Sequence, residues 1–252
     1  MLFDIVIPLG PNERCNILNQ LTYVKKNVIG YRNIYIITNN YDDLKIDGCV
    51  IIDESIFPFK MNDIGSFFKK YNNKKNRNGW YLQQLLKLYA GFVIEDILEN
   101  YLVIDADVFF LKPINFFEDK KYIFTHSNEN HIPYFDHMAR LHPSFSKKIN
   151  VSGISHHMIF NTHIIKEIFS MVETLHNKPF WIMFIESVNE HTKYDIDREE
   201  SGASEYEIYF NYIIHKHPDI VHIRSLKWEN KPSRYNINIP SDLDYVSICH
   251  YI

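Results

Sequence analysis

Residues 101–113 are Tyr-Leu-Val-Ile-Asp-Ala-Asp-Val-Phe-Phe-Leu-Lys-Pro, an apolar run interrupted by Asp105 and Asp107. The run predicts a buried strand that ends in two acids. Side chains at i and i+2 lie on the same side of a strand, or converge where it bends into a loop. Two buried, unpaired carboxylates would cost several kcal/mol, roughly, unless cations or hydrogen bonds compensate. The pair can cap a turn or bind arginine, but Mg²⁺ or Mn²⁺ is the partner that carboxylate oxygens favour.

Strand and helix patterns alternate in the sequence before this motif. Apolar runs at 3–8, 33–38 and 49–52 predict strands, and residues 13–28 carry apolar side chains at helical spacing. This order predicts an α/β fold with a mostly parallel sheet flanked by helices. Ligands bind beyond the carboxyl ends of such strands, so we expect a nucleotide site in the loop after Pro8.

A longer helical pattern at 80–99 precedes the motif, and Gln83, Gln84 and Lys87 fall off its apolar stripe. The second half predicts further strands and helices: strands at 156–161, 221–224 and 245–250, and helices at 162–175, 180–190 and 204–216. Neither an internal repeat nor a linker interrupts the chain, which predicts a single domain over 1–252.

Composition excludes several classes of protein. Of 252 residues, 46% are hydrophobic and 23% are charged, which is typical of globular chains and not of disordered or fibrous ones. The net charge of −4 argues against a nucleic-acid partner. Cys15, Cys49 and Cys249 form no CxxC pair, so we expect a reduced, cytoplasmic protein without disulfides. Neither a signal peptide nor a membrane span is expected.

Four segments together resemble the nucleotide-diphospho-sugar glycosyltransferases of the GT-A fold. Within that superfamily, the likeness is to a group of bacterial and viral proteins known mainly as a domain of unknown function. The segments are Ile-Val-Ile-Pro at 5–8, Gly-Trp-Tyr-Leu-Gln-Gln-Leu-Leu-Lys at 79–87, the 102–113 block, and Ser-Glu-Tyr-Glu-Ile-Tyr-Phe-Asn-Tyr at 204–212. The resemblance implies one GT-A domain with a Rossmann-like mixed sheet. Residues 1–113 would bind the nucleotide sugar, and residues 114–252 would bind the acceptor.

The resemblance also implies roles for individual residues. Asp105 would contact the ribose or a metal-bound water, Asp107 would bind the metal directly, and His250 would complete the metal shell as a late histidine. Asp105 would therefore belong to both the metal site and the donor site. The other implied donor-binding residues are Pro8, Leu9 and Asn12 at the end of the first strand, and Arg77, Gln83, Gln84 and Lys87 around the helix before the motif.

The expected reaction transfers a sugar from a nucleotide diphosphate, with UDP favoured over GDP, to a carbohydrate or glycoconjugate acceptor. Inversion of the anomeric centre is favoured because a candidate base can be named. A metal (Mn²⁺ or Mg²⁺) and a basic side chain would stabilise the departing diphosphate. An inverting enzyme needs a carboxylate base, for which Glu205 is preferred to Glu207. Acids at a helix N-terminus also have a purely electrostatic explanation. Because adjacent histidines on a strand face opposite ways, His156 and His157 are not expected to share one ion.

Three other kinds of protein share part of this pattern. A haloacid-dehalogenase-type phosphatase also has a DxD motif after an apolar strand, but near its N-terminus and with Thr or Val where this chain has Phe109. A sugar nucleotidylyltransferase needs a glycine-rich basic loop, of which residues 9–14 are a poor version. A nucleotide-sugar-binding protein that has lost catalysis on the same scaffold stays open, because the presence of site residues does not establish their geometry.

Overall fold

The centre of the fold is a five-stranded sheet with the order β3-β2-β1-β4-β8. Its strands are β1 (Phe3–Pro8), β2 (Tyr31–Thr38), β3 (Val50–Asp53), β4 (Asn100–Ile104) and β8 (His157–Asn161). The first four strands are mutually parallel, and β8 joins the edge beside β4 in the antiparallel direction. The expected fold class is therefore confirmed: a mostly parallel mixed sheet flanked by helices.

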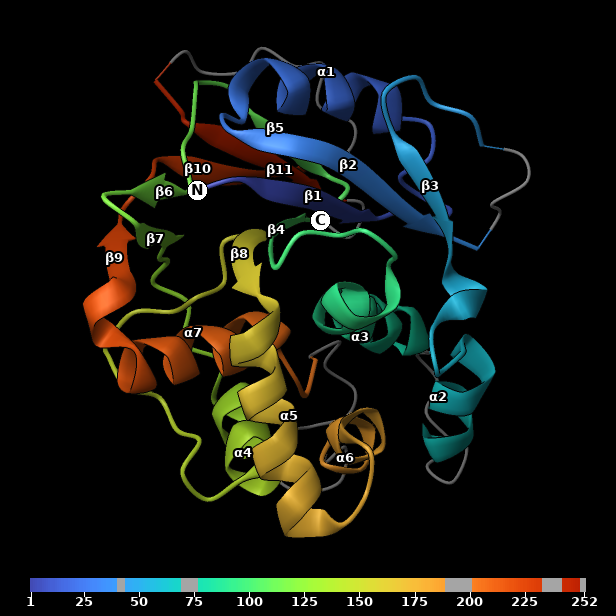
Figure 1. Cartoon of the computed structure of the whole chain (residues 1–252), viewed down its shortest axis with the longest axis vertical. Helices are drawn as coiled ribbons and strands as arrows, with labels where there is room; N and C mark the ends of the chain where they lie inside the picture. Colours follow the sequence, from blue (N-terminus) through green and yellow to red (C-terminus); the bar gives the residue numbers. More distant parts are fainter. Residues whose placement is uncertain (40–43, 69–76, 189–200, 233–241, 250–252) are drawn as a thin grey trace.

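The computed structural model describes the chain except for residues 40–43, 69–76, 189–200, 233–241 and 250–252. Figure 1 shows α1 on one side of the sheet and α3, α5 and α7 on the other. The helices are α1 (Ile17–Asn27), α2 (Met61–Phe68), α3 (Asn78–Val93), α4 (Ile132–Leu141), α5 (Thr162–His176), α6 (Phe180–Glu186) and α7 (Glu205–Lys216). Two 3₁₀ turns, Glu54–Ile56 and Pro218–Ile220, complete the helical elements. Within the described residues, every helix is too short or too polar to span a bilayer.

The aspartate motif occupies the turn between two strands that belong to different sheets. β4 ends at Ile104, and β5 (Val108–Phe110) leaves the central sheet to pair with β11 (Tyr245–Cys249), which also pairs with β10 (Trp228–Pro232). The Val108 amide donates to the Asp105 carbonyl at 3.1 Å, which closes the turn. Both carboxylates therefore leave the sheet at its carboxyl edge, where the sequence places a ligand site.

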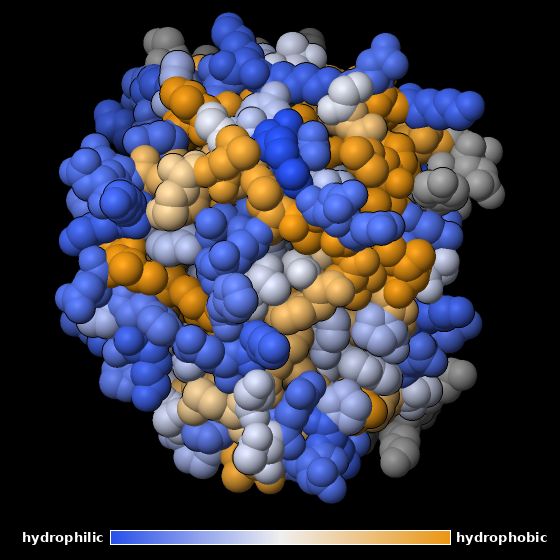
Figure 2. All heavy atoms as spheres, viewed as in Figure 1, coloured by the Kyte–Doolittle hydropathy of each residue, from blue (hydrophilic) through white to orange (hydrophobic). Residues whose placement is uncertain are grey.

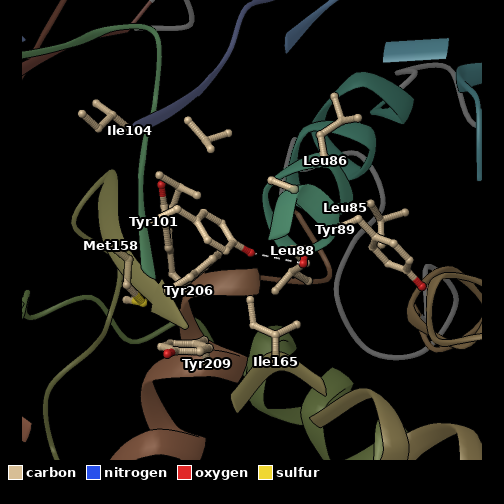
Figure 3. Packing of buried hydrophobic residues seen from close by; sticks show 14 of the residues in the cluster. Leu85, Leu86, Leu88, Tyr89, Tyr101, Ile104, Met158, Ile165, Tyr206 and Tyr209 are labelled. Atoms are coloured by element: carbon tan, nitrogen blue, oxygen red, sulfur yellow. Dashed lines mark hydrogen bonds between the residues drawn. The ribbon is translucent and has the colours of Figure 1, made fainter. Parts of the chain in front are cut away.

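A third small sheet joins β6 (Phe117–Glu118), β7 (Lys121–Thr125) and β9 (Val221–Arg224). One large hydrophobic cluster connects the central sheet to the helices below it. Figure 3 shows part of this cluster, where the Tyr101 ring lies between the sheet and α3 and its hydroxyl donates to the Leu88 carbonyl at 3.4 Å. On the outer surface, hydrophilic side chains cover much of the visible face between apolar patches (Figure 2).

Helix α3 differs from the expected amphipathic helix because it is buried on nearly all sides from Tyr81 to Ala90. Gln84 and Lys87 are 2% and 3% exposed, although they lie off the apolar stripe. The cause is the position of α3, which contacts β1 on one flank and α2 and α7 on others. Buried polar side chains need hydrogen-bond partners, and those partners lie at the aspartate turn and at the start of α7.

Candidate metal centre

Asp105, Asp107 and His156 bring one potential ligand atom each to within 4.8 Å of one another. His156 lies directly before β8, and β8 runs antiparallel to β4, so His156 faces the end of β4 where the aspartate turn begins. The Asp105 amide donates to the His156 carbonyl at 3.0 Å. His156 has a positive φ of 60°. This left-handed backbone ends the strand pattern there, and only the next residue, His157, enters the aromatic core.

The Asp105 carboxylate is fully engaged by neighbouring donors. Its Oδ1 accepts from Lys87 Nζ, from the Tyr206 hydroxyl at 3.2 Å and from Gln83 Nε2 at 3.3 Å. Its Oδ2 lies 3.3 Å from His156 Nδ1. Burial raises the pKa of Asp105, but the charges of Lys87 and His156 outweigh it and hold the pKa well below the usual range. Asp105 is therefore an ionised carboxylate that protein donors already satisfy.

Asp107 has the opposite environment. Its Oδ1 is buried without a hydrogen-bond partner, and so is Nε2 of His156. Burial, followed by the charge of Asp105, raises the pKa of Asp107 to about 6, which a hydrogen bond from Ser247 only partly offsets. A buried carboxylate oxygen and a ring nitrogen without protein donors form a donor set suited to a divalent ion. The residues present thus fit a divalent metal ion.

Lys87 connects the aspartate turn to α7. Its Nζ lies 2.7 Å from Glu205 Oε1, 3.1 Å from the Tyr206 hydroxyl and 4.4 Å from the centre of the Tyr206 ring. Burial lowers the pKa of Lys87, but Asp105 and Glu205 outweigh it, and the net shift is upward. The ammonium group is therefore charged and held between two carboxylates.

The two glutamates at the start of α7 diverge, as expected of positions i and i+2 on a helix. Glu205 contacts Lys87, whereas Glu207 accepts hydrogen bonds from Ser152 and, at 2.8 Å, from Asn211 Nδ2. Both carboxyl groups are buried, and burial raises the pKa of each. Of the two, the structure brings only Glu205 into the network around Asp105. Its role as a base stays a prediction, because its carboxylate is occupied by Lys87.

The other residues expected on α3 divide between two places. Gln83 reaches Asp105, as described above. Gln84 instead supports the start of α7, since it donates to the Ala203 carbonyl at 3.0 Å and accepts from the Glu205 amide at 3.2 Å. Arg77 precedes the first turn of α3, where its guanidinium lies 5.8 Å from the centre of the Trp80 ring.

The loop after β1 lies near the centre. Pro8 and Leu9 are buried at the end of β1, and the Leu9 amide donates to the Ile37 carbonyl at 2.8 Å. Asn12 is exposed in the following loop. The charge of Glu13 contributes to the raised pKa of Asp107, so this loop lies close to the carboxylates. His250, expected as a metal ligand, lies outside the described residues.

Sequence reasoning missed four residues that shape the centre. The sequence assigns no metal-binding role to His156, but its ring belongs to the potential ligand cluster. Gln20 of α1 donates to the Asp105 carbonyl at 2.7 Å, and Tyr206 donates to its carboxylate. The ring of Trp228 packs edge-on against His156, with 5.2 Å between the ring centres. The available signal was the position of His156 at the start of the strand predicted over 156–161, because strand ends carry site residues.

Comparisons with known proteins give a family and a distant fold likeness. The model of a family of unknown function (DUF6492) matches residues 8–229. No curated protein matches the chain. Among solved structures, the crystal structure of mouse xyloside xylosyltransferase 1 in its apo form aligns with a TM-score of 0.47 and 9% sequence identity. The alignment covers 98% of this chain and 97% of the mouse chain.

Proposed function

We propose that this chain, which belongs to the family of unknown function DUF6492, is a metal-dependent glycosyltransferase that uses a nucleotide-diphosphate sugar. The observation that carries the proposal is the cluster of Asp105, Asp107 and His156 at the carboxyl edge of a mostly parallel sheet. Open α/β sheets bind ligands at this edge. The order of the sequence segments that resemble GT-A enzymes supports the same assignment.

Asp107 and His156 would hold the ion, with Asp105 beside them. When bound, a divalent ion supplies positive charge that stabilises a departing diphosphate. The chain's own contribution is to fix these side chains in a buried setting, where electrostatic interactions are stronger than in water. Lys87 holds one oxygen of Asp105, and Gln83 projects toward the same carboxylate.

The donor would lie between the loop after β1 and the aspartate turn. We assign the base and ribose to the end of β1 around Pro8 and Leu9, and we take residues 1–113 as the donor half and 114–252 as the acceptor half. UDP-sugars are the first donors to test, and Mn²⁺ is the first ion. Glu205 can serve as an acceptor base only if Lys87 releases its carboxylate, so inversion of the anomeric centre depends on that exchange.

The test is release of UDP from UDP-sugars by the purified chain, with and without Mn²⁺, compared with Asp107→Ala and with Asp219→Ala. Asp219 is an exposed acid in the turn after α7, so its replacement serves as a matched control. We expect Mn²⁺-dependent turnover in the wild type and in the control, and none in Asp107→Ala. Normal turnover by folded Asp107→Ala would contradict the assignment. Donor binding without turnover under every condition would favour the inactive binding protein.

A further inference from the structure

Four ionisable side chains, from α3, the start of α7, the aspartate turn and the residue before β8, contact one another in series. Glu205 at the start of α7 contacts Lys87 of α3, Lys87 contacts Asp105, and Asp105 contacts His156. The Lys87 side chain is 3% exposed and that of Glu205 is 4% exposed. Two of these groups, Lys87 and His156, contact the Asp105 carboxylate, one at each of its oxygens.

A buried ammonium group is costly unless it is paired, and Lys87 is paired twice. Glu205 binds it at 2.7 Å. Nζ also donates to Oδ1 of Asp105, which accepts from Tyr206 at 3.2 Å as well. With Oδ1 held by these donors, Oδ2 is directed at His156 Nδ1, 3.3 Å away.

The contact between Asp105 and His156 selects the tautomer of the His156 ring. A ring whose Nδ1–H donates to a carboxylate presents Nε2 as the free acceptor, and that is how metal-bound histidines are usually oriented. Nε2 of His156 is the ring atom that is buried without a partner. Asp105 thus aligns the histidine, and the unpartnered Oδ1 of Asp107 supplies the carboxylate ligand.

We infer that Lys87, held by Glu205, is a positioning residue of the metal centre that fixes Asp105 as the hydrogen-bond partner of His156. Asp107 and Nε2 of His156 are then the atoms left for the ion. The inference rests on the metal site of the proposed function, but it assigns Glu205 to Lys87 and not to the acceptor hydroxyl. The same contacts are present in the metal-free protein, so the inference can be tested without measuring enzyme activity.

The first test measures Mn²⁺ affinity by titration calorimetry for the wild type, Lys87→Met and Lys178→Met. Lys178 forms an exposed ion pair with Glu186 and controls for the loss of a lysine. We expect Lys87→Met to bind Mn²⁺ roughly ten- to a hundredfold more weakly, as is typical when the partner of a ligand is lost. The control should bind as the wild type does. Unchanged affinity in folded Lys87→Met would overturn the inference and leave the proposed metal site intact.

Removing Lys87 alone leaves two buried carboxylates without their cation, and that variant can fail to fold. The double variant Lys87→Met/Glu205→Gln removes one positive and one negative charge together, so the buried charge stays balanced. We expect it to fold, as judged by its circular dichroism and melting transition, and to keep the loss of Mn²⁺ affinity. Wild-type affinity in the double variant would contradict a positioning role for this pair.

The second test examines the His156 ring in the metal-free protein by ¹H–¹⁵N NMR at alkaline pH. We expect the proton on Nδ1 in the wild type and a mixture of both tautomers in the double variant, because Asp105 is no longer anchored. A purely structural lysine would not change this signal. If the wild type binds no Mn²⁺ but the tautomer shifts as expected, the proposed function fails and the positioning role stands. The same tautomer in both proteins overturns the positioning role.

Discussion

Replacing Asp107 with Asn should make the metal-free protein more stable while removing its response to metal. Oδ1 of Asp107 is buried without a partner, and the Asp105 carboxylate lies in the same turn. Folding therefore exposes an ionised Asp107 to two unfavourable effects, the loss of hydration and repulsion by Asp105. Asn keeps the size and one acceptor oxygen, and its amide can donate to Asp105.

The magnitude follows from the pKa of Asp107, which burial and Asp105 raise from 3.8 to about 6. Because the folded pKa exceeds the unfolded one, the folded state binds the proton more tightly, and stability declines as pH rises from 3.8 to about 6. The difference of roughly 2 pKa units corresponds to about 3 kcal/mol, fully present above pH 6. Asp107→Asn removes this cost, which amounts to a rise in melting temperature of about 6–12 °C for a chain of this size.

The assay is thermal unfolding of both proteins without metal, at about pH 7.5 and about pH 4. The variant should be the more stable protein at the higher pH, and the two should converge at the lower one. Addition of Mn²⁺ should stabilise only the wild type. A variant that is less stable than the wild type at the higher pH would refute the description of Asp107 as a carboxylate with one buried oxygen that lacks a partner.

Three further outcomes follow from named contacts. Mn²⁺ should stabilise the wild type less at about pH 5.5 than at about pH 7.5, because protons compete for Asp107 and His156, whose pKa values are raised; an equal shift would contradict this. Arg32→Met should lower the free energy of unfolding in urea by roughly 3 kcal/mol, because the buried Asp4 carboxylate loses the guanidinium that binds it at 3.0 and 2.7 Å. An unchanged free energy of unfolding would show that backbone donors to Asp4 suffice. His137 is buried with its pKa lowered to about 3, so the unfolded chain binds more protons than the folded one. The free energy of unfolding should therefore fall as pH drops below 6.5. In His137→Gln the dependence of this free energy on pH should be shallower by up to about 1.4 kcal/mol per pH unit.

Much of the fold was predictable because the buried strands and helices carry strong local patterns. The apolar run at 3–8 became β1, and the helical spacing at 13–28 became α1. By contrast, α4 lies in a stretch with little recognisable pattern, where Pro133 stands in the first turn and histidines interrupt the apolar positions. Its burial comes from contacts with α7, which no local pattern encodes.

The site residues that lie within a recognisable local sequence pattern were predictable. Those brought to the site by contacts between distant segments were not. Two aspartates directly after an apolar strand can be recognised from the sequence alone. The place of His156 depends on the antiparallel pairing of β8 with β4 and on a left-handed backbone at a residue other than glycine. The burial of Lys87 likewise depends on α7, which lies more than a hundred residues later in the chain and supplies Glu205.

The most direct measurement is the melting temperature of the wild type and Asp107→Asn with a UDP-sugar, a GDP-sugar or neither, each with and without Mn²⁺. A donor at about a hundred times its dissociation constant stabilises the native state by roughly 2.7 kcal/mol, or about 5–10 °C here. We predict this rise for the wild type only when Mn²⁺ and one class of donor are both present, and no rise for Asp107→Asn. An equal rise in both proteins, or none in the wild type with any donor, would contradict a metal-dependent donor site at Asp107.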